Sequence, residues 1–124
     1  MTKSSILLVE DDPVLRDMTI RQLTVLGFKA IAVSSGEEAI EKWSDYEPDM
    51  ILMDIGLPGI DGTHATMLIR ETELREQRKR VPIVALTGHS DKDRCVSAGM
   101  DDFMQKPALL NDLKSMVNKW CATC

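Results

Sequence analysis

The sequence predicts an α/β fold in which a doubly wound, five-stranded parallel sheet is covered by five helices. Short apolar runs alternate five times with longer stretches of helical spacing, which is the pattern of repeated strand–helix units. Right-handed crossovers between parallel strands place the helices on both faces of the sheet. The chain has 124 residues, 44% of them hydrophobic, which is enough for one core. We therefore expect a single domain over residues 1–124.

The strand candidates are five short apolar runs bounded by turn-forming residues. They are Ser5 to Val9, Lys29 to Val33, Asp49 to Met53, Pro82 to Leu86 and Asp102 to Gln105. Runs this short also occur as buried pieces of helix, but their turn-like flanks favour strands.

The first two helices have recognisable N-terminal signals. Asp12 can cap a helix that has Pro13 at its first position, and Gly27 suits its end. Ser35 and Glu38 match a capping box that opens the second helix. The predicted buried residues are Val14, Leu15, Met18, Val25 and Leu26 in the first helix and Ala39, Ile40 and Trp43 in the second.

The other three helices are placed by glycines and apolar spacing. The third begins near the turn dipeptide Asp61-Gly62, whose glycine is expected to supply an unusual backbone angle. It runs into the charged stretch 70–80, which we expect to be solvated. Ser90 can cap a short fourth helix that Gly99 ends. The last helix carries an apolar stripe formed by Leu110, Leu113, Val117 and Trp120.

Composition and charge exclude several classes of function. The chain has 15 basic and 20 acidic residues, a formal charge of −5, so we expect no direct nucleic-acid partner. No apolar run approaches the roughly 18 residues of a membrane span, and no signal peptide is recognisable. We therefore expect a cytoplasmic domain without membrane contact.

Cys121 and Cys124 form a C-x-x-C pair that lacks a second ligand pair. An incidental pair is the favoured interpretation, and a reversible thiol switch is the alternative.

Polar residues follow four of the five predicted strands. Glu10 and Asp11 follow the first strand, Asp54 the third, Thr87 the fourth and Lys106 the fifth. In doubly wound sheets, binding sites form beyond the carboxyl ends of the strands. We therefore expect these side chains to meet in one cleft.

Crowded carboxylates require a counter-charge. Unpaired, Glu10, Asp11 and Asp54 would repel one another, and a bound cation removes that cost. Hard oxygen ligands with room for water and phosphate suit Mg²⁺, or Mn²⁺ in its place. No His or Cys belongs to this group of strand-end residues, which argues against zinc. A divalent ion, a lysine ammonium and a hydroxyl around one carboxylate form a phosphoryl-transfer site, with that carboxylate as nucleophile.

Four stretches of the chain carry a family resemblance. They are residues 6–13 (ILLVEDDP), 53–62 (MDIGLPGIDG), 82–88 (PIVALTG) and 98–107 (AGMDDFMQKP). Together and in this order, they resemble response-regulator receiver domains of two-component signal transduction, most closely those of hybrid sensor histidine kinases. The resemblance implies a flavodoxin-like three-layer sandwich with strand order 2-1-3-4-5. It also implies a histidine kinase or histidine-phosphotransfer domain as the partner in a phosphorelay.

The resemblance assigns the acidic residues to phosphate and metal binding. It implies that Asp54 is the phosphoacceptor, and that Glu10 and Asp11 are the acid pair, with Asp11 the more direct metal ligand. The backbone carbonyl of Gly56 would complete the protein's share of the metal shell. Phosphorylation and dephosphorylation would both be catalysed by the domain itself.

The resemblance also implies a conformational switch and a lysine that contacts the phosphate. Thr87 and Phe103 look like the switch pair, and Lys106 like the family's lysine, at a peptide bond that is often cis. The face formed by the fourth helix, fifth strand and fifth helix would carry the output. Gly56 is smaller than the residue many family members have, so we expect Gly88, His89 and solvent access to set the lifetime of the phosphate.

Three other functions are less consistent with the residues. A phosphatase with an aspartyl-phosphate intermediate typically has a second Asp two positions after the nucleophile, where this chain has Gly56. A flavodoxin-like FMN-binding protein would need a phosphate loop where Glu10 and Asp11 stand. The complete set of site residues argues against an interaction module that is not phosphorylated.

Overall fold

The computed structural model describes residues 4–88 and 92–121. Five parallel strands form one sheet with the order β2-β1-β3-β4-β5, which confirms the predicted fold class. The strands are β1 (Ser5–Val9), β2 (Lys29–Val33), β3 (Met50–Asp54), β4 (Ile83–Thr87) and β5 (Asp102–Gln105). The helices are α1 (Pro13–Val25), α2 (Gly36–Tyr46), α3 (Gly62–Arg75), α4 (Lys92–Ala98) and α5 (Leu110–Trp120).

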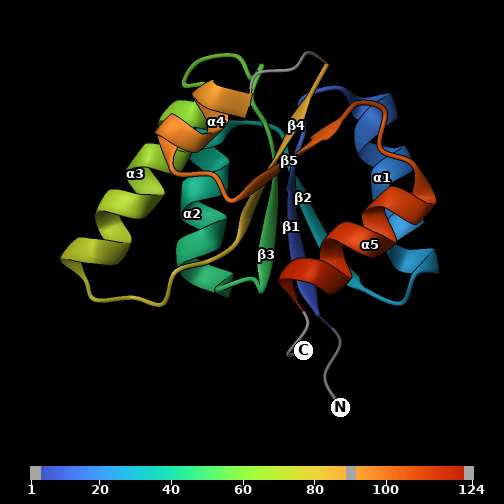
Figure 1. Cartoon of the computed structure of the whole chain (residues 1–124), viewed down its shortest axis with the longest axis horizontal. Coiled ribbons are helices and arrows are strands. Elements are labelled where there is room, and N and C mark those ends of the chain that lie inside the picture. Colours follow the sequence, from blue (N-terminus) through green and yellow to red (C-terminus); the bar gives the residue numbers. More distant parts are fainter. Residues whose placement is uncertain (1–3, 89–91, 122–124) are drawn as a thin grey trace.

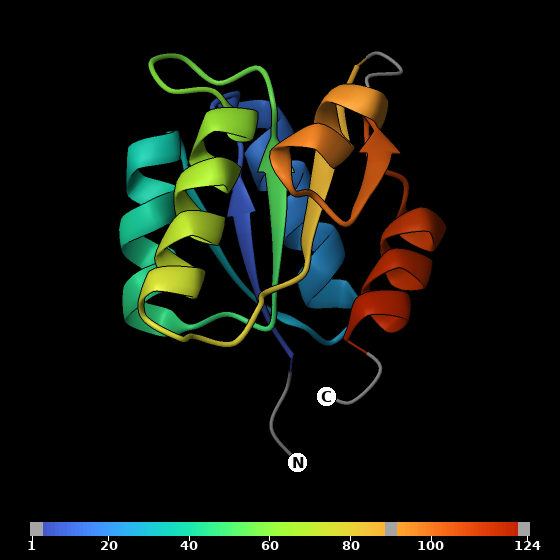
Figure 2. The ribbon, with the colours of Figure 1, turned by 60° about the vertical axis from the view of Figure 1, so that its left-hand side comes forward.

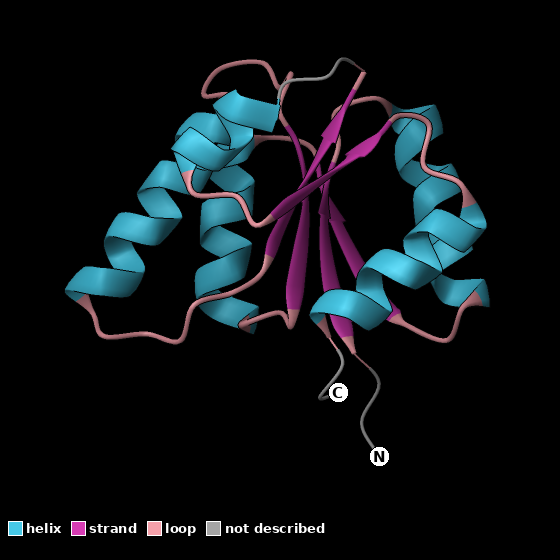
Figure 3. Cartoon of the chain, in the orientation of Figure 1, coloured by secondary structure: helices cyan, strands magenta, loops and turns pink. Residues whose placement is uncertain are grey.

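The helices cover the sheet in two layers. Helices α2, α3 and α4 lie on one face, and α1 and α5 lie on the other (Figures 1 and 3). Each face has its own apolar core, in which Trp43 and Ile69 pack on one side and Leu23 and Leu113 on the other. Because the central strands β3 and β4 are buried along their whole length, their sequences are apolar without alternation up to the last residue of each strand.

Two strands begin and end one residue later than predicted. Asp54 pairs with Leu86 and Thr87 with Gln105, so these polar residues are the last of their strands. At the other end of β3, Asp49 stays outside the strand and its carboxylate accepts a hydrogen bond from the Ser5 backbone at 2.7 Å. All strands point the same way, so the loops that follow them gather at one end of the molecule (Figure 2).

The helix caps agree closely with the sequence signals. The Asp12 carboxylate accepts hydrogen bonds from the backbone N–H groups of Val14 and Leu15. Ser35 accepts from the N–H of Glu38 at 3.2 Å, while the Glu38 carboxylate accepts from Ser34. In a capping box the glutamate accepts from the backbone N–H of the cap residue itself, so here that second bond is made by the residue before the cap, Ser34, instead of Ser35. The predicted cap Ser90 lies outside the described residues.

The predicted buried face of α1 was wrong at its two ends. Val14 is 74% exposed and Val25 is 76% exposed, whereas Thr19 and Leu23 are buried. At roughly 100° per residue, the nine steps from Val14 to Leu23 make about two and a half turns, so the two side chains lie on opposite sides of the helix. Leu23 packs against the sheet, so Val14 points away from it.

The charged stretch 70–80 is not uniformly solvated, as had been expected. Arg70 donates to the Gly99 carbonyl at 2.9 Å and to the Val81 carbonyl at 2.7 Å. Its guanidinium also pairs with Glu73 at 2.9 Å and with Asp101 at 2.8 Å. These contacts join the middle of α3 to the starts of β4 and β5, at the end of the sheet opposite the polar loops.

Cys121 is buried, with its sulfur 3.8 Å from the Asp49 carbonyl oxygen, and Cys124 lies outside the described residues. Within residues 4–88 and 92–121, no helix has the length and apolar character needed to cross a bilayer.

The Arg70 network predicts a large effect on stability. Replacing Arg70 by alanine leaves Glu73 and Asp101 without their buried partner, so the free energy of unfolding should fall by about 3 kcal/mol. Arg75→Ala is the control because its ion pair with Glu71 is exposed, and it should change stability by less than about 0.5 kcal/mol. Urea unfolding measures both, and equal losses for the two variants would contradict the role given to Arg70.

Candidate functional site

The polar residues predicted at the strand ends meet in one open cleft of about 490 Å³. Because the carboxyl ends of parallel strands share one edge of the sheet, the loops after β1, β3, β4 and β5 all contribute to it. The residues that line it are Glu10, Asp11, Asp12, Leu15, Asp54, Ile55, Gly56, Thr87, Gly88 and Lys106.

A lysine bridges two buried acids at the centre of this cleft. The Lys106 Nζ lies 2.8 Å from Asp54 Oδ2 and 3.0 Å from Glu10 Oε1. The side chains of Glu10 and Asp54 are only 3% and 5% exposed, so each needs a partner to remain charged. The second oxygen of Asp54 accepts a hydrogen bond from the Gly56 backbone N–H at 3.0 Å.

Three carboxylates are close enough to share a cation. One oxygen each from Glu10, Asp11 and Asp54 lies within 4.8 Å of the other two. Asp11 is exposed and the other two are buried, so the cluster opens to solvent on the side of Asp11. An all-oxygen set with an open side fits Mg²⁺ or Mn²⁺, which keep part of their water shell.

The acids have opposite pKa shifts. Burial, together with a hydrogen bond to Asp54, raises the pKa of Glu10 to about 7, although Lys106 acts in the lowering direction. Burial alone would raise the pKa of Asp54 too, but hydrogen bonds from Glu10, Lys106 and the Gly56 N–H hold it below its usual value. Burial opposes the charge on Lys106, yet its bonds to Asp54 and Glu10 keep the pKa of Lys106 raised. Asp54 is therefore the ionised acid of the pair near neutral pH, and Glu10 holds a proton part of the time.

The loop after β3 is fixed by a close backbone approach. A Cβ atom at Gly62 would overlap the carbonyl oxygen of Asp54, so only glycine fits there. The Gly62 N–H donates to the Ile55 carbonyl at 3.2 Å, and Asp61 caps α3 through the N–H of His64. The positive backbone angle expected at Gly62 is wrong, since Gly27, Gly59 and Gly99 are the glycines with positive φ in the described residues. Sequence reasoning missed this steric role, although the Asp-Gly dipeptide marked the position.

The remaining predicted residues lie at the edge of the cleft. Thr87 is buried and its carbonyl accepts from the Lys106 N–H at 2.8 Å, while Gly88 is exposed. The peptide bond between Lys106 and Pro107 is cis. His89 lies outside the described residues.

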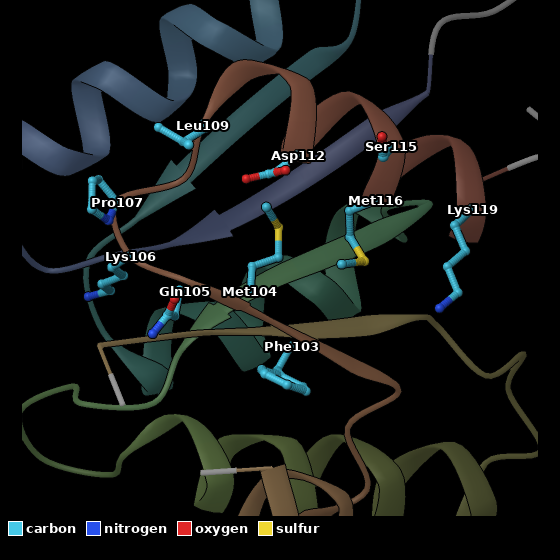
Figure 4. A pocket seen from close by; sticks show the side chains of 10 residues that line it. All are labelled: Phe103, Met104, Gln105, Lys106, Pro107, Leu109, Asp112, Ser115, Met116 and Lys119. Atoms are coloured by element: carbon cyan, nitrogen blue, oxygen red, sulfur yellow. The ribbon is translucent and has the colours of Figure 1, made fainter. Parts of the chain in front are cut away.

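Phe103 lies away from the acids, in the wall of a second and larger pocket. The ring is half-buried and packs against the core that lies under α3 and α4. The pocket, of about 750 Å³, runs between β5 and α5 and is shown in Figure 4. Lys106, the residue that follows β5, lines both this pocket and the acidic cleft.

Comparison with known proteins agrees with this geometry. A family model described as the response regulator receiver domain matches residues 6–118. The hybrid signal transduction protein dokA of Dictyostelium discoideum is 35% identical over 98% of the chain, which spans only 7% of that protein.

Two solved structures are similar over nearly the whole chain. One is the receiver domain of a Pseudomonas aeruginosa PAO1 sensor histidine kinase, with a magnesium ion coordinated in its active-site cleft. It is 35% identical, with a TM-score of 0.85 and coverage of 98% of this chain and 99% of that one. The other is the receiver domain of Ssk1 from Saccharomyces cerevisiae, in complex with the histidine phosphotransfer protein Ypd1. It is 26% identical, with a TM-score of 0.91 and coverage of 98% and 91%.

The strand order, the acidic cleft bridged by a lysine and the match over residues 6–118 lead to one conclusion. This chain belongs to the response regulator receiver-domain family and is a receiver domain of two-component phosphorelay signalling.

Proposed function

We propose that the domain accepts a phosphoryl group on Asp54 from a phosphohistidine, and that Mg²⁺ or Mn²⁺ is required. The observation that carries this proposal is the contact of Lys106 Nζ with both Asp54 and Glu10. This contact holds a positive charge beside an ionised carboxylate in an open cleft, which is the arrangement that phosphoryl transfer needs.

The donor set fits the metal. Asp11, Asp54 and the Gly56 carbonyl are the proposed ligands, with Glu10 completing the acid pair. The similar receiver domain from Pseudomonas aeruginosa, which holds magnesium in its cleft, supports this choice. When bound, the ion supplies positive charge that offsets the negative charge of the transferring phosphoryl group.

The chain's own residues carry the remaining steps. A carboxylate oxygen of Asp54 attacks phosphorus and forms a P–O bond, while the P–N bond breaks and its electron pair stays on the imidazole nitrogen, which takes a proton from solvent. The Lys106 ammonium, which contacts the Asp54 carboxylate before transfer, then contacts the new phosphoryl oxygens. The Thr87 hydroxyl donates a hydrogen bond to one of these oxygens. Since these contacts exist only in the phosphorylated state, they shift the domain toward a second conformation in which Phe103 turns inward.

The proposed donor is a histidine kinase or a histidine-phosphotransfer domain. The complex of the similar Ssk1 receiver with Ypd1 supports the second, and the hybrid relatives support a relay within a larger signalling protein. The domain acts as a signalling element that catalyses its own phosphorylation and dephosphorylation. The extent of the domain over 1–124 and its cytoplasmic location remain predictions from the sequence.

The assignment of Asp54 is tested by labelling. Asp54→Asn removes the nucleophile but keeps the size of the side chain, so labelling by phosphoramidate with Mg²⁺ should fall to background while the circular dichroism spectrum is unchanged. Asp61→Asn is the matched control, because asparagine also caps helices, and it should be labelled like the wild type. Labelling of Asp54→Asn to the same level as the wild type would refute the assignment.

The raised pKa of Glu10 predicts how stability depends on pH without metal. Since the folded-state pKa is about 7 and the ordinary value 4.5, protonated Glu10 stabilises the fold fully below the ordinary value, and that stability is lost as the pH rises through 7. Between pH 6 and 8 in chelator, the unfolding free energy of the wild type should fall by roughly 1 kcal/mol more than that of Glu10→Gln. The lowered pKa of Asp54 acts only at more acidic pH. Parallel pH profiles for the two proteins would count against the shift, and added Mg²⁺ should restore the wild type at pH 8.

The size of Gly56 predicts the lifetime of the phosphate. An added Cβ would lie 3.7 Å from Asp54 Oδ1, so a larger side chain fits there and covers the acyl phosphate against water. Gly56→Met should slow hydrolysis of the phosphorylated protein, Gly56→Ala should slow it less, and His89→Ala should also change the rate. Decay of the radiolabel measures these rates, and three variants that decay like the wild type would show that access is set elsewhere.

A further inference from the structure

The segment that carries Lys106 has an unusual anchor at its far end. Residues 106–109 connect β5 to α5, and at the near end the Lys106 N–H donates to the Thr87 carbonyl at 2.8 Å. At the far end, α5 begins after Leu109, which makes no side-chain capping bond. Helices α1, α2 and α3, in contrast, begin at a side-chain cap. The start of α5 therefore lacks the side-chain cap that the starts of α1, α2 and α3 have.

Gln22 of α1 supplies the anchor from another element. Its Nε2 donates to the Ala108 carbonyl at 3.1 Å, across 86 positions of sequence. Ala108 is buried and packs in the core under α1 and α5. Because this carbonyl lies two residues after Lys106, the bond restrains the backbone from which the lysine extends.

Glutamine at position 22 costs folding free energy, so its presence there is not explained by a gain in stability. The other amide atom, Gln22 Oε1, is buried and has no hydrogen-bond partner among the described residues. A buried acceptor without a partner loses its hydration and gains nothing in return. An apolar side chain of the same length would avoid that loss, so the bond to Ala108 is the contribution that glutamine alone makes at this position.

We infer that Gln22 is a positioning residue for Lys106, which rests on the function proposed above for Asp54 and Lys106. The Lys106 side chain is long and flexible, and it must reach Asp54 at 2.8 Å and Glu10 at 3.0 Å at the same time. By fixing the Ala108 carbonyl, Gln22 sets where the backbone of Lys106 stands. The ammonium group then lies in place before the phosphoryl group arrives, and little of its freedom has to be lost during transfer.

The test compares Gln22→Met with Arg21→Met, because Arg21 is a neighbour on α1 that makes no hydrogen bond or ion pair with residues 106–109 within the described part of the chain. Acetyl phosphate serves as donor, because a small donor needs no protein–protein contact that a substitution on the surface of α1 could disturb. For Gln22→Met we expect an unchanged or higher urea midpoint and a Mg²⁺ dissociation constant within about twofold of the wild type, since Lys106 is not a metal ligand. The rate of phosphorylation should fall by on the order of fivefold or more, while Arg21→Met should match the wild type.

A double variant separates positioning from general damage. If Gln22 acts through Lys106, the variant Gln22→Met with Lys106→Met should be as slow as Lys106→Met alone. Additive losses would overturn the inference, as would a wild-type rate for Gln22→Met. A loss of rate that is matched by weaker Mg²⁺ binding and lower stability would also overturn it.

A spectroscopic readout keeps the inference independent of phosphorylation. In the wild type, the methylene protons next to Lys106 Nζ should give two distinct signals in carbon–proton correlation spectra, because Asp54 and Glu10 hold the ammonium. In Gln22→Met these signals should merge, and in Arg21→Met they should stay distinct. Unchanged signals in Gln22→Met would overturn the role of Gln22, whereas a wild type that takes up no phosphate would refute only the proposed function.

Discussion

Two buried acids can lie together at the end of this sheet because one lysine stands between them. Glu10 and Asp54 are almost completely removed from water, and a carboxylate in such a place is stable only with a partner. Lys106 contacts both carboxylates but carries only one positive charge. Burial and the neighbouring Asp54 raise the pKa of Glu10 to about 7, so protonation of Glu10 removes part of the remaining negative charge. The negative charge of the cleft is thus offset by the Lys106 ammonium and by partial protonation of Glu10.

The fold makes this balance possible by bringing distant loops to one edge. Strands β3 and β4 are buried on both faces, and Asp54 and Thr87 are their last residues. The apolar core therefore reaches directly to the polar groups, which lowers the local polarizability of the surroundings and strengthens each charge interaction. Gly62 brings the loop after β3 so close to the Asp54 backbone that no other residue fits. The Asp54 backbone is therefore fixed both by its pairing in the sheet and by the close approach of this loop.

Most of the fold and most of the cleft could be predicted from the sequence. The strand–helix alternation gives the doubly wound sheet, and Asp12 and Ser35 give two helix starts, because these signals depend on neighbours in the chain. The meeting of Glu10, Asp11, Asp54 and Lys106 follows from the shared edge of parallel strands. The unpredicted features depend on tertiary contacts instead: Leu23 decides which side of α1 is buried, and the carbonyls of Val81 and Gly99 draw Arg70 out of solvent. No local pattern could have shown that Gln22 reaches Ala108.

The Arg70 cluster also limits how the molecule can move. Its guanidinium joins α3 to the carbonyl of Gly99, just after α4, and to Asp101, just before β5. Arg80 adds a further ion pair to Asp101 at 2.8 Å, so that corner of the molecule is held by a connected set of charged groups. A rearrangement that begins at the cleft therefore meets a fixed point where α4 ends, because moving Gly99 away from α3 would break its hydrogen bond to Arg70.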